Sequence, residues 1–202
     1  MGQKVVSENL EIEFKTLLSK EEFLRTADFF QLEENHFFTQ INYYFDTADF
    51  QLKEKHIGLR VRTLSKNAEI TLKVPEKVGL LEINDSLSTA QAQEIIDSGV
   101  LPNSGAVYNK LITLGIAKDD LRLIGSLTTK RAEKKLPQGL LALDESWYNE
   151  QHDFELELEV SDAIIGKKEF FALLDTLNIK EKPSPNKIQR MMQSSSKKIK
   201  KL

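Results

Sequence analysis

Apolar and polar residues alternate along much of the chain, with the period of two that a half-buried β-strand imposes. The clearest example is FELELEV, residues 154–160, where glutamates occupy every second position and Phe, Leu and Val fill the others. Including this one, eight segments carry a strand pattern: 9–17, 36–47, 57–64, 68–75, 78–87, 121–136, 138–148 and 152–160. The alternation therefore predicts a strand-rich chain.

Helical spacing of apolar residues separates these strands. Ser19, with acidic residues shortly after it, has the sequence of a capped helix start. Helices are expected at 19–34, 88–99, 104–115 and 167–179, with a short helical turn at 48–56 and a proline-broken segment at 182–192. Two groups of strands with hairpin connections, divided by two helices, favour an antiparallel sheet that closes or forms a sandwich.

Length and composition narrow the class of protein. The 202 residues contain no linker-like stretch, so we expect one domain over 1–192 and a short basic tail over 193–202 that frays. The absence of cysteine excludes disulfides and thiolate metal sites and fits a cytoplasmic location. A net charge of −3 disfavours a general nucleic-acid binder, and no apolar run resembles a signal peptide or a membrane span.

The polar positions of the strands are unusual because charges dominate them and are segregated. Acidic residues gather on the first and last strands, whereas Arg and Lys gather on the middle ones. In chain order these positions are Glu11, Glu13, Lys15, Arg60, Arg62, Glu69, Lys73, Glu82, Lys130, Arg131, Asp144, Glu155, Glu157 and Glu159. A sheet with one solvated face explains the alternation alone. The segregation favours a closed barrel of about eight strands with a charged interior and helices packed outside.

Such an interior points to metal and phosphate chemistry. Clustered carboxylates in a confined space need a cation to neutralise them. Without cysteine or a histidine cluster, hard oxygen ligands favour Mg²⁺ or Mn²⁺. Guanidinium and ammonium groups beside them suit a phosphate polyanion. Together these groups have the layout of phosphoryl-transfer sites.

Short motifs along the chain strengthen this interpretation. EIEFK, residues 11–15, has the form ExExK, and it is followed in order by YYFDT, LRVR, TLK, TTKR, ALD, FELELE and NKIQR. This series resembles the CYTH family, the triphosphate tunnel metalloenzymes, named after class IV adenylate cyclases and thiamine triphosphatases. The resemblance extends from Glu8 to Met192 and is closest to the small single-domain branch of Gram-positive bacteria.

The resemblance implies an α+β fold, a closed eight-stranded antiparallel β-barrel whose tunnel is polar and charged. It implies metal ligands at Glu11, Glu13 and Asp144 and at two of three glutamates on the last strand, with Glu155 and Glu157 favoured over Glu159. The residues implied to bind and act on the triphosphate are Lys15, Arg60, Arg62, Lys73, Arg131 and Lys187. Lys130 is the rival of Arg131, because a one-residue slip in a strand reverses the face. Arg190 is expected to assist, and Glu82 resembles a further acidic tunnel position.

The function implied is metal-dependent hydrolysis of inorganic triphosphate or a small organic triphosphate such as thiamine triphosphate, with two Mg²⁺ or Mn²⁺ ions. One alternative is cyclisation of ATP to cyclic AMP, which would require an adenosine pocket that the sequence does not display. Another is a phosphate- or polyphosphate-binding module without turnover. The expected partner is a small-molecule triphosphate, with neither a membrane nor a specific nucleic acid, and a homodimer is left open.

Overall fold

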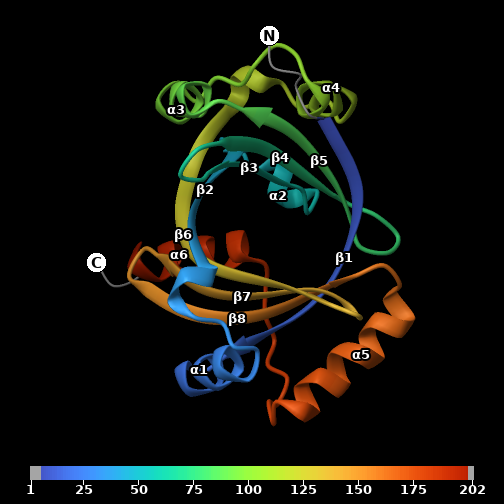
Figure 1. The fold of residues 1–202 in the computed structure, drawn as a ribbon. Helices are drawn as coiled ribbons and strands as arrows, with labels where there is room; N and C mark the ends of the chain where they lie inside the picture. The colour runs from blue at the N-terminus through green and yellow to red at the C-terminus, as the bar shows by residue number, and fades with distance from the viewer. Residues whose placement is uncertain (1–5, 200–202) are drawn as a thin grey trace. The chain divides into compact units, whose positions relative to one another are not determined.

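The computed structural model describes residues 6–199. The strands are β1 (Val6–Leu18), β2 (Phe37–Thr47), β3 (Gly58–Thr63), β4 (Ala68–Pro75), β5 (Leu80–Leu87), β6 (Leu121–Leu136), β7 (Gly139–Tyr148) and β8 (Gln151–Val160). The helices are α1 (Lys20–Phe29), α2 (Gln51–Glu54), α3 (Thr89–Ser98), α4 (Ala106–Thr113), α5 (Ala163–Thr176) and α6 (Lys187–Ile199), with 3₁₀ turns η1 (Glu34–His36) and η2 (Lys118–Asp120). The hydrogen-bonded order β1-β5-β4-β3-β2-β6-β7-β8 closes the sheet into an antiparallel barrel (Figure 1), which confirms the predicted fold class.

The helices lie where the sequence signals place them, but α1 ends earlier than expected, at Phe29, and α5 begins earlier, at Ala163, where Asp162 caps it. The C-terminal end differs more. Ser19 and Glu22 form the expected capping box at the start of α1, each side chain accepting the other residue's backbone N–H. Helix α6, in contrast, begins directly after the proline-broken segment and continues to Ile199, where a fraying tail was expected. Lys, Gln, Arg and Met favour the helix once the prolines are passed. Residues 200–202 lie outside the described part. No helix within residues 6–199 has the length and apolar character needed to cross a bilayer.

The described residues form two compact units, here called the first and second units. The first comprises 6–10 and 40–126, and the second comprises 11–39 and 127–199. Strands β1, β2 and β6 each run through both units. The single-domain organisation expected from the sequence stays a prediction.

In the first unit, β3, β4 and β5 separate an apolar face from a charged one. Leu59, Val61, Ile70, Leu72 and Ile83 are buried and belong to a core that also contains apolar side chains of α3 and α4. Both helices contact this sheet (Figure 1). The alternate positions carry the cations predicted from the sequence. The packing of the two helices therefore fixes which face each cation occupies.

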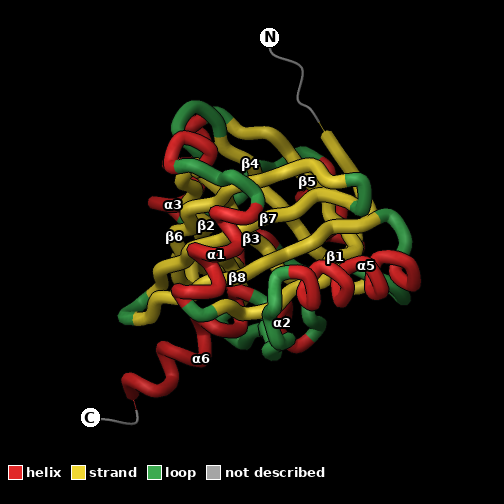
Figure 2. The backbone as a smooth tube through the Cα atoms, turned by 60° about the horizontal axis from the view of Figure 1, so that its bottom comes forward, coloured by secondary structure: helices red, strands yellow, loops and turns green. Residues whose placement is uncertain are grey.

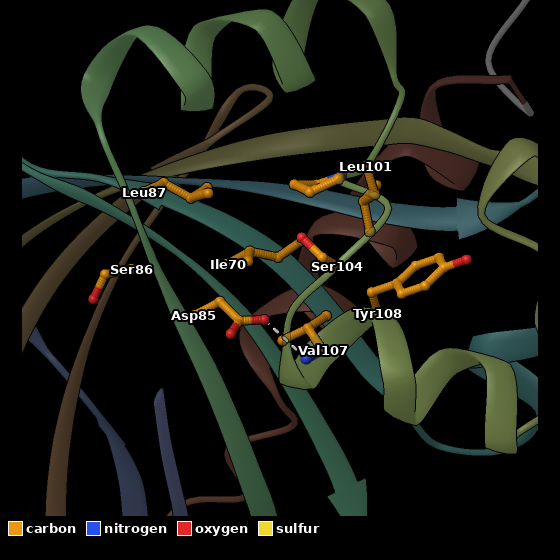
Figure 3. Close-up of a pocket in the computed structure, with 9 residues that line it drawn as sticks. Ile70, Asp85, Ser86, Leu87, Leu101, Ser104, Val107 and Tyr108 are labelled. Carbon is orange, nitrogen blue, oxygen red and sulfur yellow. Dashed lines mark hydrogen bonds between the residues drawn. The ribbon is translucent and has the colours of Figure 1, made fainter. Parts of the chain in front are cut away.

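A small pocket beside β4 and β5 marks where α4 joins this sheet (Figure 3). Asp85 on β5 points toward the helix start and accepts hydrogen bonds from the backbone N–H groups of Ala106 (3.0 Å) and Val107 (2.9 Å). Its carboxylate thus caps the helix and ties α4 to the strand. The pocket therefore marks the junction between β5 and α4, and we assign it a structural role in the first unit.

In the second unit, the β7–β8 hairpin has the same two-faced character. Leu143 lies opposite Leu156, and both pack in a core with Phe23 of α1 and Phe170 of α5. Helices α1 and α5 both contact β8 (Figures 1 and 2). A Cβ on Gly166 would lie 2.4 Å from Val160, so glycine permits the close approach of α5 to this strand. The opposite face of the hairpin carries the acidic residues.

Candidate metal centre

Three buried carboxylates of the β7–β8 hairpin converge in the second unit. Asp144 lies directly opposite Glu155 in the strand pairing, and Glu157 follows on the same face two residues later. All three are buried, and each offers an oxygen within 4.8 Å of the oxygens of the other two. This donor set fits a hard divalent cation such as Mg²⁺ or Mn²⁺. Glu155 and Glu157 are the pair that sequence reasoning favoured over Glu159.

Arg131 forms one side of this cluster. It lies opposite Asp144 in the β6–β7 pairing, and its Nε and Nη2 donate to the two Asp144 oxygens at 2.7 and 2.6 Å. The same Nη2 donates to Glu157 Oε2 at 2.5 Å. Burial raises the pKa of Asp144, but the charges of Arg131 and Lys187 outweigh it and leave the pKa lowered. Asp144 is therefore held as a carboxylate in a buried place.

Lys130, the rival of Arg131, faces away from the cluster. It lies opposite Glu145 rather than Asp144, and its Nζ donates to Glu34 at 2.5 Å and lies over the Phe37 ring. Alternation along β6 places neighbouring residues on opposite faces. Arg131 therefore contacts the carboxylates of the cluster and Lys130 does not, whereas a substrate-binding role for either residue stays a prediction.

Lys187, the first residue of α6, reaches the centre of the cluster. Its Nζ lies 2.9 Å from Asp144 Oδ2 and 2.6 Å from Glu157 Oε1, and it also donates to Glu155. Burial lowers the pKa of Lys187, but the three carboxylates raise it well above its ordinary value. In turn, burial raises the pKa of Glu157, but Lys187, Arg131 and Lys15 bring it well below its usual range. Lys187, Asp144 and Glu157 thus hold one another in the charged state.

Arg190, one helical turn after Lys187, secures the third carboxylate. Its Nη1 and Nη2 donate to the two Glu155 oxygens at 2.8 and 3.1 Å. Nη1 also donates to Ser184 Oγ at 2.7 Å and to the Pro185 carbonyl at 2.9 Å, and Nε lies 3.1 Å from Asp153 Oδ2. Arg190 therefore fixes Glu155 and the segment before α6 together. The assisting role expected for Arg190 takes the form of positioning.

The ExExK residues of β1 lie beside this cluster without joining its closest group. Lys15 is opposite Glu157 in the β1–β8 pairing, and its Nζ donates to Glu13 Oε1 at 2.5 Å and to Asn186 Oδ1 at 2.8 Å. Burial lowers the pKa of Lys15, but Glu13 and the neighbouring glutamates leave it raised. Glu13 is opposite the exposed Glu159. Within residues 6–199, Glu11, Glu13 and Glu159 stand outside the group of three converging carboxylates.

The first unit holds the other predicted cations on one sheet face. Lys73 lies opposite Glu82, and their charged atoms are 2.9 Å apart, with Arg60 Nη2 3.9 Å from the same carboxylate. Arg62 donates to Asn42 at 3.0 Å and to Glu69 at 3.3 Å. Burial raises the pKa of Glu82, but Lys73 and Arg60 outweigh it and lower the pKa to about 2. The further acidic position predicted at Glu82 is therefore an internal partner of these cations.

One cross-strand row in the first unit contains polar atoms with no hydrogen-bond partner among the described residues. They are Arg60 Nε, Thr71 Oγ1 and Asn84 Oδ1, all buried. Strand pairing places Arg60 opposite Thr71, and Thr71 opposite Asn84. Sequence reasoning omitted the two neutral residues, although each sits two positions from a predicted charged one. The available signal was the period of two, which places Thr71 on the face of Glu69 and Lys73, and Asn84 on the face of Glu82.

The positioning residues of the second unit were also missed. Ser184 donates to Glu155, Asp153 pairs with Arg190, and Asn186 accepts from Lys15. Ser184 and Asn186 come from an irregular segment that carries no periodicity, so only tertiary structure brings them to the carboxylates. Asp153 follows the strand alternation of β8 and could have been recognised as a same-face neighbour of Glu155.

Comparisons with known proteins agree with this architecture. Residues 9–192 match the family model described as CYTH domain. "Putative triphosphatase YjbK" of Bacillus subtilis (strain 168) is 40% identical over 195 residues, covering 96% of this chain and 100% of the relative.

Two solved structures share the fold. A "putative adenylate cyclase" from Bacillus halodurans is 41% identical, with a TM-score of 0.87 and coverage of 91% of this chain and 97% of its own. HpAC1 from Hippeastrum, called a putative adenylyl cyclase with a dominant triphosphatase activity, is 22% identical with a TM-score of 0.77. It covers 92% of this chain and 96% of its own, and at this identity it supports the fold alone.

Proposed function

Because the chain belongs to the CYTH domain family, we propose that it is a divalent-metal-dependent triphosphatase acting on inorganic triphosphate or a small organic triphosphate. The observation that carries the proposal is the cluster of Asp144, Glu155 and Glu157, which combines three buried carboxylates with cations suited to phosphate. The triphosphatase name of the Bacillus subtilis relative supports the same reaction class.

The three carboxylates would hold the metal, with Glu11 and Glu13 of β1 as further candidate ligands. A bound Mg²⁺ or Mn²⁺ would supply charge neutralisation for phosphate oxygens and acidify a coordinated water. We include the two ions implied by the family resemblance in this proposal. Asp144 and Glu157 are held ionised by their cationic neighbours, so these two need lose no proton at neutral pH.

The cations of the second unit would bind and orient the phosphoryl group. Arg131 offers a planar, always charged guanidinium, and Lys15 and Lys187 offer ammonium groups. Donors fixed in a partly dry site stabilise charge that develops on the transferred phosphoryl group. In this proposal no side chain forms a covalent intermediate, and water is the nucleophile.

Arg60, Arg62 and Lys73 of the first unit are proposed as phosphate-binding residues in their own right. Arg60 supports this role directly, because its buried Nε has no partner within the described residues and is available to an oxygen acceptor. Thr71 in the same row would add a hydroxyl group that can donate to a phosphate oxygen. This set is a prediction to be tested separately from the metal centre.

One assay separates hydrolysis from its two alternatives. Purified protein would be incubated with Mg²⁺ or Mn²⁺ and with tripolyphosphate, ATP or thiamine triphosphate in turn. Orthophosphate release that EDTA abolishes is the expected result. Formation of cyclic AMP without orthophosphate would indicate the cyclase suggested by the name of the Bacillus halodurans neighbour. Tight binding of tripolyphosphate without product would indicate a non-catalytic module, compatible with a cytoplasmic polyphosphate-binding role.

Matched variants test the ligand assignment. Asp144→Asn and the double variant Glu155→Gln with Glu157→Gln should lose metal-dependent turnover by about 10²-fold or more. Glu145→Gln is the control, because Glu145 neighbours Asp144 on β7 but faces the other way and pairs with His152. Glu11→Gln with Glu13→Gln measures the contribution of β1. Full activity in the Glu155/Glu157 variant would refute the proposed centre.

A further inference from the structure

The carboxylate cluster of the second unit carries its own counter-ions. Asp144, Glu155 and Glu157 contribute three negative charges, and Arg131, Lys187 and Arg190 contribute three positive ones. Every one of these ions touches at least one of opposite sign. Arg190 also pairs with Asp153, and Arg131 also lies near Glu133. A divalent cation placed among Asp144, Glu155 and Glu157 would stand beside the Lys187 ammonium, which is unfavourable in a buried place unless that ammonium withdraws.

The Lys187 ammonium lies where a metal ion bound by all three carboxylates would lie. Its Nζ contacts all three carboxylates, whereas Arg131 contacts Asp144 and Glu157, and Arg190 contacts Glu155. A metal bound to one oxygen from each carboxylate would lie at about 2.0–2.1 Å from them if it were Mg²⁺. An ammonium at 2.6–2.9 Å from oxygens of the same groups and a metal cannot occupy that space together.

The other two cations are held more firmly. Arg131 forms a two-pronged pair with Asp144, and Arg190 is additionally bound to Ser184, Pro185 and Asp153. Lys187, in contrast, is a point charge on a flexible four-carbon stem at the first residue of α6. It can leave the carboxylates by rotation of its own side chain.

We propose that Lys187 is an internal counter-ion that a divalent cation displaces from Asp144, Glu155 and Glu157, and that the displaced ammonium then pairs with the triphosphate. This inference rests on the proposed function and adds to it an order of binding, in which the metal enters before the triphosphate. Metal entry releases Lys187, and the arriving polyanion gives the released charge a new partner. Metal and triphosphate should accordingly bind with positive coupling through this one side chain.

Calorimetric titration of Mn²⁺ tests the displacement. Wild-type protein, Lys187→Met and Lys182→Met would be stripped with EDTA, exchanged into buffer and titrated without triphosphate. We expect Lys187→Met to bind Mn²⁺ about tenfold more tightly than the wild type, because no resident ammonium has to be removed. Lys182 is the matched control, since it pairs with Glu22 and does not touch the carboxylates. Its substitution should leave the Mn²⁺ affinity unchanged.

The coupling is tested with a non-hydrolysable triphosphate analogue. In the wild type the analogue should tighten Mn²⁺ binding, and in Lys187→Met this gain should shrink by about tenfold. Equal or weaker Mn²⁺ affinity in Lys187→Met, with the gain intact, would overturn the displacement. If Asp144→Asn also left Mn²⁺ binding unchanged, the proposed metal centre itself would fail, so the two failures are distinguishable.

A measurement on the unaltered chain covers the case in which Lys187→Met does not fold. Lysine acetylation followed by mass spectrometry would report the reactivity of Lys187, whose side chain is only 13% exposed. We expect slow acetylation in EDTA, faster acetylation with saturating Mn²⁺, and slow acetylation again with Mn²⁺ and the analogue. Lys182, with 41% side-chain exposure, serves as the internal reference. An unchanged reactivity of Lys187 at Mn²⁺ saturation would refute the proposal.

Discussion

Arg131 and Lys130 are adjacent in the chain and lie in different environments. Arg131 contacts two buried carboxylates, whereas Lys130 contacts Glu34 and an aromatic ring. Their charges are the same, so the difference comes from strand alternation and not from chemistry. A residue pair of this kind lets one experiment isolate the effect of the face from the effect of the charge.

Arg131→Gln should reduce triphosphate hydrolysis by about 10²-fold or more, since it removes a fixed donor from the charge-stabilising set. Lys130→Gln should leave hydrolysis unchanged. Initial rates with tripolyphosphate at saturating Mg²⁺ measure both, and circular dichroism confirms that each variant is folded. Similar losses in the two variants would contradict the assignment of Arg131 to the site.

Glu82 gives a prediction about stability and pH. Its pKa in the folded chain is about 2, below the ordinary value of 4.5, so its stabilising contribution is complete above pH 4.5 and is lost as the pH falls toward 2. Glu82→Gln should therefore be less stable than the wild type at pH 7, on the order of 2 kcal/mol.

The difference between Glu82→Gln and the wild type should shrink between pH 5 and pH 3. Urea unfolding at these pH values gives the free energy of unfolding of the wild type and of Glu82→Gln. Exposed Glu76, in the turn between β4 and β5, provides a control substitution, Glu76→Gln. A difference that stayed constant with pH would show that the carboxylate charge does not stabilise the first unit.

Sequence reasoning at this scale succeeded where alternation decides the outcome. The period of two places Glu155 and Glu157 on the same face of β8. The register of the β7–β8 pairing then places Asp144 next to Glu155 on that face. Alternation cannot decide which of two neighbouring cations faces inward, because that depends on the register with the adjacent strand. It also cannot bring Ser184 or Asn186 to the site, because their segment has no period.

At the scale of elements, the helices are positioned by particular contacts with the strands. Asp85 on β5 caps α4, and the alternating apolar residues of β8 receive α1 and α5. Helices with a capping box or an apolar stripe were predicted well for this reason. Helix α6 was not, since its start depends on Lys187 and Arg190 meeting buried carboxylates from a distant hairpin.

The joint between β5 and α4 gives a prediction for one element. Asp85→Ala removes the acceptor for two backbone N–H groups and should lower the free energy of unfolding by about 1–2 kcal/mol. Gly105→Ala should also destabilise, because the residue has φ 123° and its Cβ would lie 2.4 Å from the Asp85 carboxylate. In the double variant the clash disappears while the backbone strain remains, so the two losses should not add.

Chemical denaturation of the two single variants and the double variant measures this coupling. Asp85→Asn, which keeps one oxygen acceptor, should lose less stability than Asp85→Ala. Strict additivity in the double variant would show that Gly105 does not depend on the Asp85 side chain.

At the scale of the whole molecule, three strands belong to both compact units. Strands β1, β2 and β6 each pass from one unit into the other without interruption. A unit that unfolded alone would have to release its part of each shared strand. We therefore expect one cooperative thermal transition, with calorimetric and van't Hoff enthalpies in agreement. Two resolved transitions in differential scanning calorimetry would contradict the single-domain organisation predicted from the sequence.

The closed fold itself was predictable because eight alternating segments leave few alternatives. The division into two units was not, since each strand pattern continues across the boundary without a change of composition or a proline. The sequence pattern indicates which residues of a strand share a face. It does not indicate which neighbouring elements each part of a long strand contacts, and those contacts define the two units.

The pairing of Asp144, Glu155 and Glu157 with three resident cations has a consequence for the life of the protein in a cell. Many small metalloproteins stay unfolded until their ion arrives. We expect this chain to fold without an ion, because Arg131 of β6 and Lys187 and Arg190 of α6 neutralise the buried acids once the strands and α6 have packed. When metal is scarce, the protein would then be inactive but still folded and resistant to proteolysis. A renewed supply of metal would restore its activity without new synthesis.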